Sequence, residues 1–154
     1  MPTLEGDLSK PAGRFAVVAA KFNRDVVDRL VEGALQGFRK HGVADDSVDL
    51  VRVPGSLEVP LACKQLAGSG HYAAIVALGA VIQGETDHYT YVCQEAAAGV
   101  MRATLATGVP IIFGILTCQS EELALARAGG AEGNKGYDAA LAAIEMANLG
   151  KKIR

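Results

Sequence analysis

The chain has no tryptophan, few aromatic residues and only three cysteines among its 154 residues. Three cysteines without closely spaced pairs indicate neither a disulfide framework nor a zinc site, and they favour a reducing, cytoplasmic setting. Fifteen Lys and Arg against 17 Asp and Glu leave no basic surplus, so no nucleic-acid partner is expected. The longest apolar run, 72–82, is about half the length needed to span a bilayer, and the N-terminus lacks the features of a signal peptide. We therefore expect no membrane partner.

Hydrophobic residues, at 50% of the chain, and 18 glycines are what the sequence does have. This composition predicts a sizeable core with close backbone packing, and the length fits a single domain over residues 1–154. Residues 1–12 precede the first core strand as an extended N-terminal arm. Within that arm, 3–8 is either a frayed tail or an extra strand that docks on another surface, and 4–8 has the pattern of a strand able to extend a neighbour's sheet.

Short apolar runs alternate with helical spacing along the rest of the chain. Strands are predicted at 15–20, 48–53, 74–82 and 111–117. Helices are predicted around 27–38, at 57–67 with Ser56 as N-cap, at 89–107, from Ser120 to about 128, and at 137–149. Alternation of this kind predicts an α/β fold with three layers, in which a four-stranded parallel sheet lies between helices.

Polar, glycine-containing loops follow each of the four predicted strands. They are 21–23, 54–58, 83–88 and 118–120. Because ligands bind at the carboxyl ends of strands in open parallel sheets, we expect these four loops to surround the binding site.

His88 is the strongest catalytic candidate, because an imidazole can give or take a proton near neutral pH. It stands where the loop Gly84-Glu85-Thr86 leads into a helix, and free backbone N–H groups at such a position can hold a phosphate. The alternatives are a surface histidine that takes part in local capping, and an ordinary turn between a strand and a helix.

Other candidates have two interpretations each. Glu58 either binds a ligand hydroxyl or only complements the start of its helix. Phe22, at a strand end, is either the edge of the core or a platform for a planar ring, whereas Phe113 lies mid-strand, where a core role is the default. Arg127 either complements a helix C-terminus or binds a phosphate with two hydrogen bonds.

Six ordered motifs resemble the lumazine synthase family, and they extend over nearly the whole chain. They are Phe22-Asn23, the segment Pro54-Gly55-Ser56-Leu57-Glu58-Val59-Pro60, the segment 78–88 (LGAVIQGETDH), the segment 113–117 (FGILT), Arg127-Ala128-Gly129 and Gly133-Asn134-Lys135-Gly136.

This resemblance implies a flavodoxin-like fold and an enzyme that needs neither a metal nor an organic cofactor. It implies the condensation of 5-amino-6-(ribitylamino)uracil with 3,4-dihydroxy-2-butanone 4-phosphate to 6,7-dimethyl-8-ribityllumazine, the penultimate step of riboflavin biosynthesis. By position, His88 would transfer protons. The residues that would bind the ribitylaminouracil are Phe22, Asn23, Ser56, Leu57, Glu58, Ala80, Val81, Ile82, Phe113 and Lys135. Those that would surround the phosphate of the butanone are Gly84, Glu85, Thr86 and Arg127.

Three positions depart from the usual family pattern. Leu57 stands where the family usually has an aromatic residue, which makes one wall of the ribityl site smaller. Gln83 stands where the family usually has Arg or Lys, so Arg127 must supply more of the positive charge. After His88 the chain reads Tyr89-Thr90-Tyr91, which lacks the acidic residue that could have oriented the imidazole.

The resemblance also implies a homo-oligomer. Family members are pentamers, and we expect twelve pentamers in a shell of sixty subunits here, which could enclose riboflavin synthase. Arg127 and Phe113 would then come from the subunit next to the one that supplies His88, and the arm could add a strand to a neighbour's sheet. The alternatives are a non-catalytic flavin- or lumazine-binding module and a mainly structural shell protein on the same fold.

Overall fold

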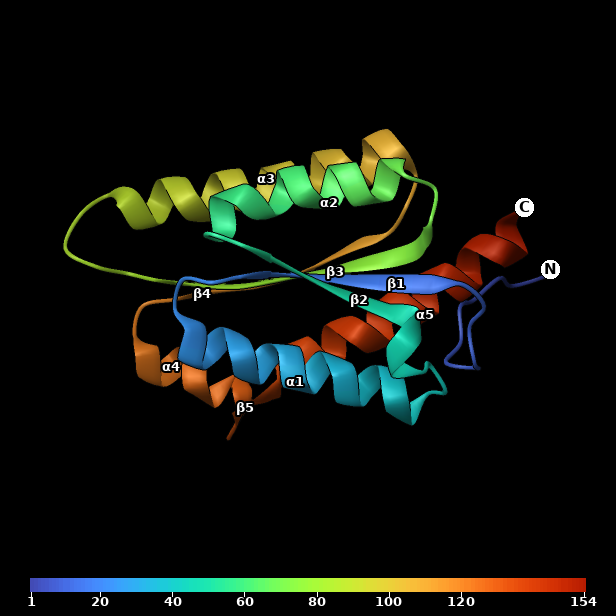
Figure 1. Ribbon diagram of the computed structural model, residues 1–154, viewed down its shortest axis with the longest axis horizontal. Helices are drawn as coiled ribbons and strands as arrows, with labels where there is room; N and C mark the ends of the chain where they lie inside the picture. The colour runs from blue at the N-terminus through green and yellow to red at the C-terminus, as the bar shows by residue number, and fades with distance from the viewer.

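Four parallel strands form the central sheet of the computed structural model, which describes residues 1–154 (Figure 1). The strands are β1 (Arg14–Ala20), β2 (Val48–Val53), β3 (Tyr72–Ile82) and β4 (Ile111–Cys118). Their order across the sheet is β2-β1-β3-β4, so β2 and β4 are the two edge strands. The predicted α/β fold with a four-stranded parallel sheet is confirmed.

Helices cover both faces of this sheet. They are α1 (Arg24–Lys40), α2 (Val59–Gly68), α3 (His88–Thr107), α4 (Glu121–Ala126) and α5 (Lys135–Ile153). Helices α2 and α3 lie on one face and α1 and α5 on the other, as Figure 1 shows. None of these helices combines the length and the apolar content that crossing a bilayer requires.

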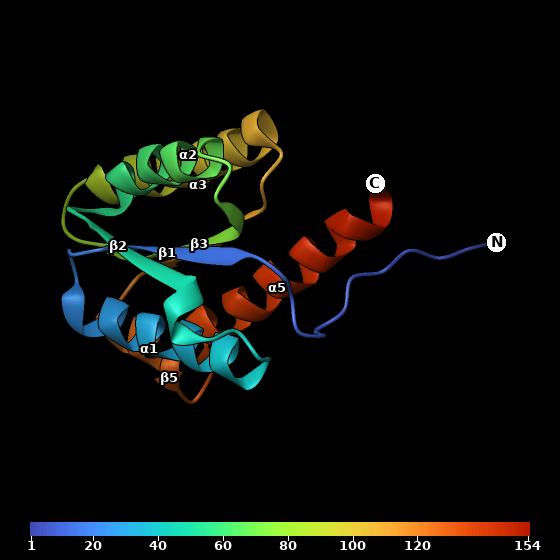
Figure 2. The same cartoon turned by 45° about the vertical axis from the view of Figure 1, so that its right-hand side comes forward.

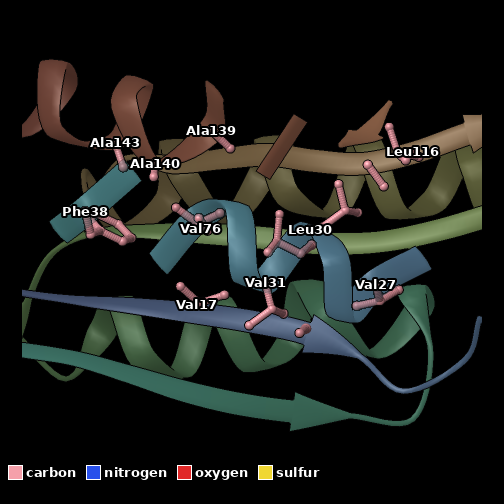
Figure 3. Close-up of a cluster of buried hydrophobic side chains, with 14 of the residues drawn as sticks. Val17, Val27, Leu30, Val31, Phe38, Val76, Leu116, Ala139, Ala140 and Ala143 are labelled. Atoms are coloured by element: carbon pink, nitrogen blue, oxygen red, sulfur yellow. The ribbon is translucent and has the colours of Figure 1, made fainter. Parts of the chain in front are cut away.

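Strand β1 lies at the centre of the core, because every residue from Phe15 to Ala20 is fully buried. Alternate side chains of a strand point to opposite faces. Phe15, Val17 and Ala19 accordingly join the cluster under α1 and α5, while Ala16, Val18 and Ala20 join the cluster under α2 and α3. Figure 3 shows the first of these clusters, with Leu30 of α1 among its labelled residues. The continuous apolar run in the sequence thus reflects burial on both faces.

Helices α1 and α5 pack unusually closely, because glycines stand at their contact. A side chain at Gly136 would collide with the backbone of Leu30, and one at Gly33 would collide with the Asn134 side chain. The Asn134 side chain accepts a hydrogen bond from Tyr137 N and donates one to Arg29 O, both near 3 Å. This close contact fixes the start of α5, and with it Lys135.

The predicted start of the second helix is wrong. Ser56 does not cap a helix over 57–67; residues Ser56–Glu58 form a 3₁₀ turn, and α2 begins at Val59 with Pro60 in its first turn. Proline suits that position because its missing N–H would have no partner there. Ser56 therefore does not cap a helix, and its side chain lies buried against β3.

The chain after β4 also differs from the prediction in detail. Ser120 caps α4 as expected, by accepting a hydrogen bond from Leu123 N, but the helix ends at Ala126. A small hairpin of β5 (Ala128–Gly130) and β6 (Gly133–Asn134) follows, where turn and helix had been expected. The last helix is longer than the predicted 137–149, because Asn134 caps it two residues earlier.

The N-terminal residues hold neither helix nor strand before β1. Figure 2 shows the first residues running away from the domain, near the end of α5. The strand pattern at 4–8 therefore finds no partner strand within its own chain.

Candidate active site

The sheet order places the end of β1 next to the end of β3, although the two strands are not consecutive in the chain. Such a switch point leaves a crevice at the carboxyl ends of the strands. A cleft of about 490 Å³ opens there. Eleven of the predicted site residues line it, namely Phe22, Asn23, Ser56, Leu57, Glu58, Ala80, Val81, Ile82, Gly84, Thr86 and His88. We call it the first cleft.

Asn23 holds the two sides of the switch point together. Its side-chain Nδ2 donates a hydrogen bond of 2.7 Å to the backbone oxygen of Ala80, at the end of β3. It is also the one non-glycine residue in the left-handed region, with φ of 58°. Asparagine tolerates that conformation better than most residues. Because this amide is engaged within the chain, Asn23 shapes the first cleft whatever else it contacts.

Phe22 precedes Asn23 and projects from the protein, with 71% of its surface exposed. Hydrogen bonds from Lys21 N to Val53 O and from Phe22 N to Pro54 O extend the pairing of β1 and β2 beyond the strand ends. These bonds set the backbone of Phe22 beside Pro54. An exposed ring on a well-held backbone is a platform for stacking a planar ligand, so the alternative of a core-edge role for Phe22 does not apply.

Polar groups of the second loop face the same cleft. Ser56 is one of only two buried polar side chains in the protein. Its hydroxyl lies over Gly79 of β3, where a Cβ would stand 2.5 Å from Ser56 Oγ. Glu58 and Leu57 are exposed at the rim. The cleft therefore offers a hydroxyl and a carboxylate on one side and an apolar wall on the other.

The loop before α3 carries the predicted phosphate site. Its backbone is held lightly, by a hydrogen bond of 3.4 Å from His88 N to Thr86 Oγ1, and no side chain caps the helix. Thr90 N also donates to Asp87 O, at 3.1 Å, whereas the N–H groups of residues 84–87 and of Tyr89 have no partner in the chain and are free to bind an anion. Glu85 is exposed and lines neither cleft.

The remaining predicted residues lie elsewhere. Phe113, Arg127 and Lys135 line a second cleft of about 450 Å³, beside the edge strand β4. Arg127 Nη1 donates a hydrogen bond of 3.1 Å to Leu123 O, and Lys135 N donates one of 2.8 Å to Arg127 O. Arg127 thus complements the end of α4, as one of its two interpretations predicted, and its guanidinium keeps further donors for a ligand.

One chain therefore does not bring all the predicted site residues together. The expectation that the four loops surround one site holds for the first three. The fourth loop does not join them, because Cys118 at its start lines the second cleft. Several lining residues were not among the predicted site residues, among them Tyr89 and Val92 in the first cleft and Thr117, Glu132 and Asp138 in the second. Tyr89 had a local signal, because it follows His88 in the first turn of α3.

The two clefts differ in charge. The first contains one carboxylate, Glu58, and no Lys or Arg. The second contains both cations of the predicted site, Arg127 and Lys135, together with Glu132 and Asp138. The first cleft therefore offers an anionic ligand only hydrogen-bond donors. The side chains with a fixed positive charge lie in the second cleft.

Cysteine chemistry is disfavoured, and only Cys118 of the three cysteines lines a cleft. Burial raises the pKa of all three thiols, to about 12 for Cys63, and the nearby Arg127 opposes this effect only in part at Cys118. A neutral thiol is a poor nucleophile. No group of three or more His, Cys, Asp or Glu side chains is placed to hold a metal ion.

Comparison with known proteins agrees with this geometry. A model of the family described as 6,7-dimethyl-8-ribityllumazine synthase matches residues 12–151. A protein of Desulfatibacillum aliphaticivorans with that same name is 45% identical over 151 residues, which are 98% of this chain and 97% of that protein. The similarity includes every residue that lines either cleft.

Proposed function

This chain belongs to the 6,7-dimethyl-8-ribityllumazine synthase family, and from that premise we propose how its two clefts carry out the reaction. The enzyme condenses 5-amino-6-(ribitylamino)uracil with 3,4-dihydroxy-2-butanone 4-phosphate to 6,7-dimethyl-8-ribityllumazine, the penultimate step of riboflavin biosynthesis. The alternative of a non-catalytic binding or shell protein is not favoured, because the relative that matches almost the whole chain is a synthase.

The ribitylaminouracil binds in the first cleft. Phe22 stacks on its pyrimidine ring, and the backbone of Ala80, Val81 and Ile82 faces the edge of that ring. Exposure of the Phe22 ring at the mouth of this cleft supports the assignment. Ser56 and Glu58 hold hydroxyl groups of the ribityl chain, and the exposed side chain of Leu57 lies against it.

The phosphate of the second substrate binds at the loop Gly84-Glu85-Thr86. The backbone N–H groups of residues 84–87, which have no partner in the chain and precede the 20-residue helix α3, support this assignment because they can donate hydrogen bonds to an anion placed there. Since the first cleft contains no Lys or Arg, neutralisation of the phosphate must come from Arg127.

Arg127 reaches that phosphate from a second copy of the chain. One copy supplies the first cleft, and the next supplies the second cleft with Arg127, Phe113 and Lys135. The division of the predicted residues between two clefts is the observation that carries this proposal. A contact between two different surfaces of identical chains forms a ring when the rotation from copy to copy closes, and an open filament when it does not. The ring we propose is a pentamer, with twelve pentamers forming a shell.

His88 moves protons during imine formation, elimination of phosphate and ring closure. The place of His88 in the lining of the first cleft, next to the phosphate loop, supports this role. The amine and the ketone are intrinsically reactive, so much of the rate enhancement comes from holding them together in one orientation. The imidazole of His88 adds general acid–base catalysis.

The arm at residues 1–12 adds a strand to the sheet of a neighbouring chain in the proposed assembly. The edge strand β2, whose outer side pairs with no strand of its own chain, supports this arrangement. The cytoplasm is the proposed location, in keeping with three unpaired cysteines.

A direct assay tests the function. Purified protein is mixed with both substrates, and the rise of lumazine absorbance is compared with the spontaneous reaction at the same concentrations. We expect a rate proportional to protein concentration. A protein that binds the product tightly yet leaves the rate at its spontaneous value would be a binding module instead.

A further inference from the structure

A cluster of hydrogen bonds ties the N-terminal arm to α5 without using any cleft residue. Asn148 Nδ2 donates to the backbone oxygens of Asp7 at 2.9 Å and Ser9 at 3.0 Å, and to Asp7 Oδ1 at 3.2 Å. Lys152 Nζ donates to Asp7 Oδ2 at 3.0 Å and to Glu5 O at 2.8 Å. We call Asp7, Ser9, Asn148 and Lys152 the arm clasp.

Asn148 is the central residue of the arm clasp. It is one of only two buried polar side chains in the protein, the other being Ser56 in the first cleft. A buried amide is costly unless it is hydrogen-bonded, and the bonds that its nitrogen donates all go to the arm. The domain is therefore built around the presence of this segment.

The fit of the arm on α5 is close as well as polar. Gly6 lies so near the backbone of Glu145 that a side chain at position 6 would collide with it. Ser9 donates two hydrogen bonds to Asp7 Oδ1, which turn the chain locally. These hydrogen bonds help lower the pKa of Asp7 to about 2, so its carboxylate stays charged and bonded at neutral pH. The charged carboxylate thus accepts hydrogen bonds from Ser9, Asn148 and Lys152.

Residues 1–5, which precede the arm clasp, are exposed to solvent. Met1 and Leu4 are exposed apolar residues that precede the clasp. Strand β2 is an edge strand, and its Leu50 is exposed too. Extended apolar residues and an unpaired strand edge are complementary, because a strand gains main-chain hydrogen bonds by adding to an edge.

We propose that the arm clasp sets the direction in which the arm leaves its domain, so that residues 1–4 reach the β2 edge of a second copy of this chain. This inference rests on the strand addition proposed above. The clasp residues are positioning residues for assembly and touch no substrate. Because the Asp7–Lys152 pair is nearly half exposed, it holds little by itself, and Asn148 contributes most.

The test uses the full chain and four variants: deletion of residues 1–4, Asn148→Ala, Lys152→Met and the control Lys151→Met. Lys151 is exposed next to Lys152 and forms no hydrogen bond or ion pair. Two quantities are measured: hydrogen exchange of the β2 amides, and the concentration at which the assembly dissociates in sedimentation. We expect deletion to abolish the protection of those β2 amides that do not bond to β1. Asn148→Ala should raise the dissociation concentration about tenfold, Lys152→Met about threefold, and the control should change nothing.

The outcomes separate the two proposals. If deletion leaves β2 protection and dissociation unchanged, strand addition is wrong and the clasp inference falls with it. If deletion weakens the assembly while both clasp variants behave like Lys151→Met, strand addition stands and the clasp inference alone is overturned. Should Asn148→Ala fail to fold, the result for Lys152→Met decides whether the clasp inference stands, since the Lys152 side chain lies at the surface and its replacement should leave the fold intact. Lys152→Arg, which keeps the cation, should then restore parental behaviour.

Discussion

Two substitutions at Asn23 separate its two contributions to the first cleft. The side chain donates a 2.7 Å hydrogen bond to Ala80 O, and the backbone has φ of 58°. Asn23→Gly removes the hydrogen bond but allows the left-handed backbone without strain. Asn23→Ala removes the same bond and keeps the Cβ, but lacks the short polar side chain through which asparagine tolerates the left-handed conformation.

The expected costs follow from these terms. Loss of the hydrogen bond costs about 1 kcal/mol in both variants. Glycine adds roughly 0.5 kcal/mol through the freedom of the unfolded chain, whereas alanine adds about 1.5 kcal/mol of backbone strain. We therefore expect Asn23→Gly to lower the free energy of unfolding by about 1.5 kcal/mol and Asn23→Ala by about 2.5 kcal/mol.

Urea unfolding at one fixed protein concentration measures this difference, because assembly makes apparent stability depend on concentration. The kcat/KM for lumazine formation should fall in the same order, since Phe22 depends on the same turn. Equal stability of the two variants, or a more stable Asn23→Ala, would refute the claim that this backbone is strained.

Further expectations concern catalysis, packing and acid stability. His88→Ala should slow turnover by about 10²-fold or less. Sedimentation and circular dichroism should stay as in the parent, because an exposed imidazole adds little to the core. Unchanged kinetics would remove His88 from the mechanism. In urea unfolding, Gly136→Ala should lower the free energy of unfolding by about 1–3 kcal/mol, because the new side chain collides with Leu30. The control Gly150→Ala lies in the same helix but meets open space, so it should be neutral or slightly stabilising. Asp7→Asn should destabilise the protein at pH 5–8. The pKa of Asp7 is lowered from 3.8 to about 2, so its stabilisation is fully present above pH 3.8 and is lost as the pH falls through about 2, where parent and variant should converge in thermal unfolding.

The sequence predicted the sheet well because its strands are buried on both faces. Phe15–Ala20 has no polar residue to interrupt it, and the structure adds only Arg14 to the predicted strand. Helix boundaries were harder, because they depend on contacts distant in sequence. The start of α5 combines a local signal, the Asn134 cap on Tyr137 N, with the contact of Gly136 with α1, which no local pattern contains.

The candidate site was predictable as a set of residues and not as a shape. Motif resemblance identified Phe22, His88 and Arg127 together, yet a linear pattern does not state which residues one chain can bring into contact. Arg127 is separated from the others because β4 is an edge strand and α4 follows it at that edge. The hydrogen bonds of Asn148 could not be predicted from the sequence either, because its partners lie about 140 positions away in the arm.

A mixing experiment tests most directly whether the active site is shared between two copies of the chain. His88→Ala chains and Arg127→Ala chains are each purified, unfolded, combined in equal amounts and refolded together, and lumazine formation is compared with each variant refolded alone. If one chain supplies His88 and the next supplies Arg127, roughly a quarter of the interfaces in a closed ring contain both intact residues. The account predicts activity well above that of either variant. Activity equal to the average of the two variants would place both residues in one chain's site and contradict it.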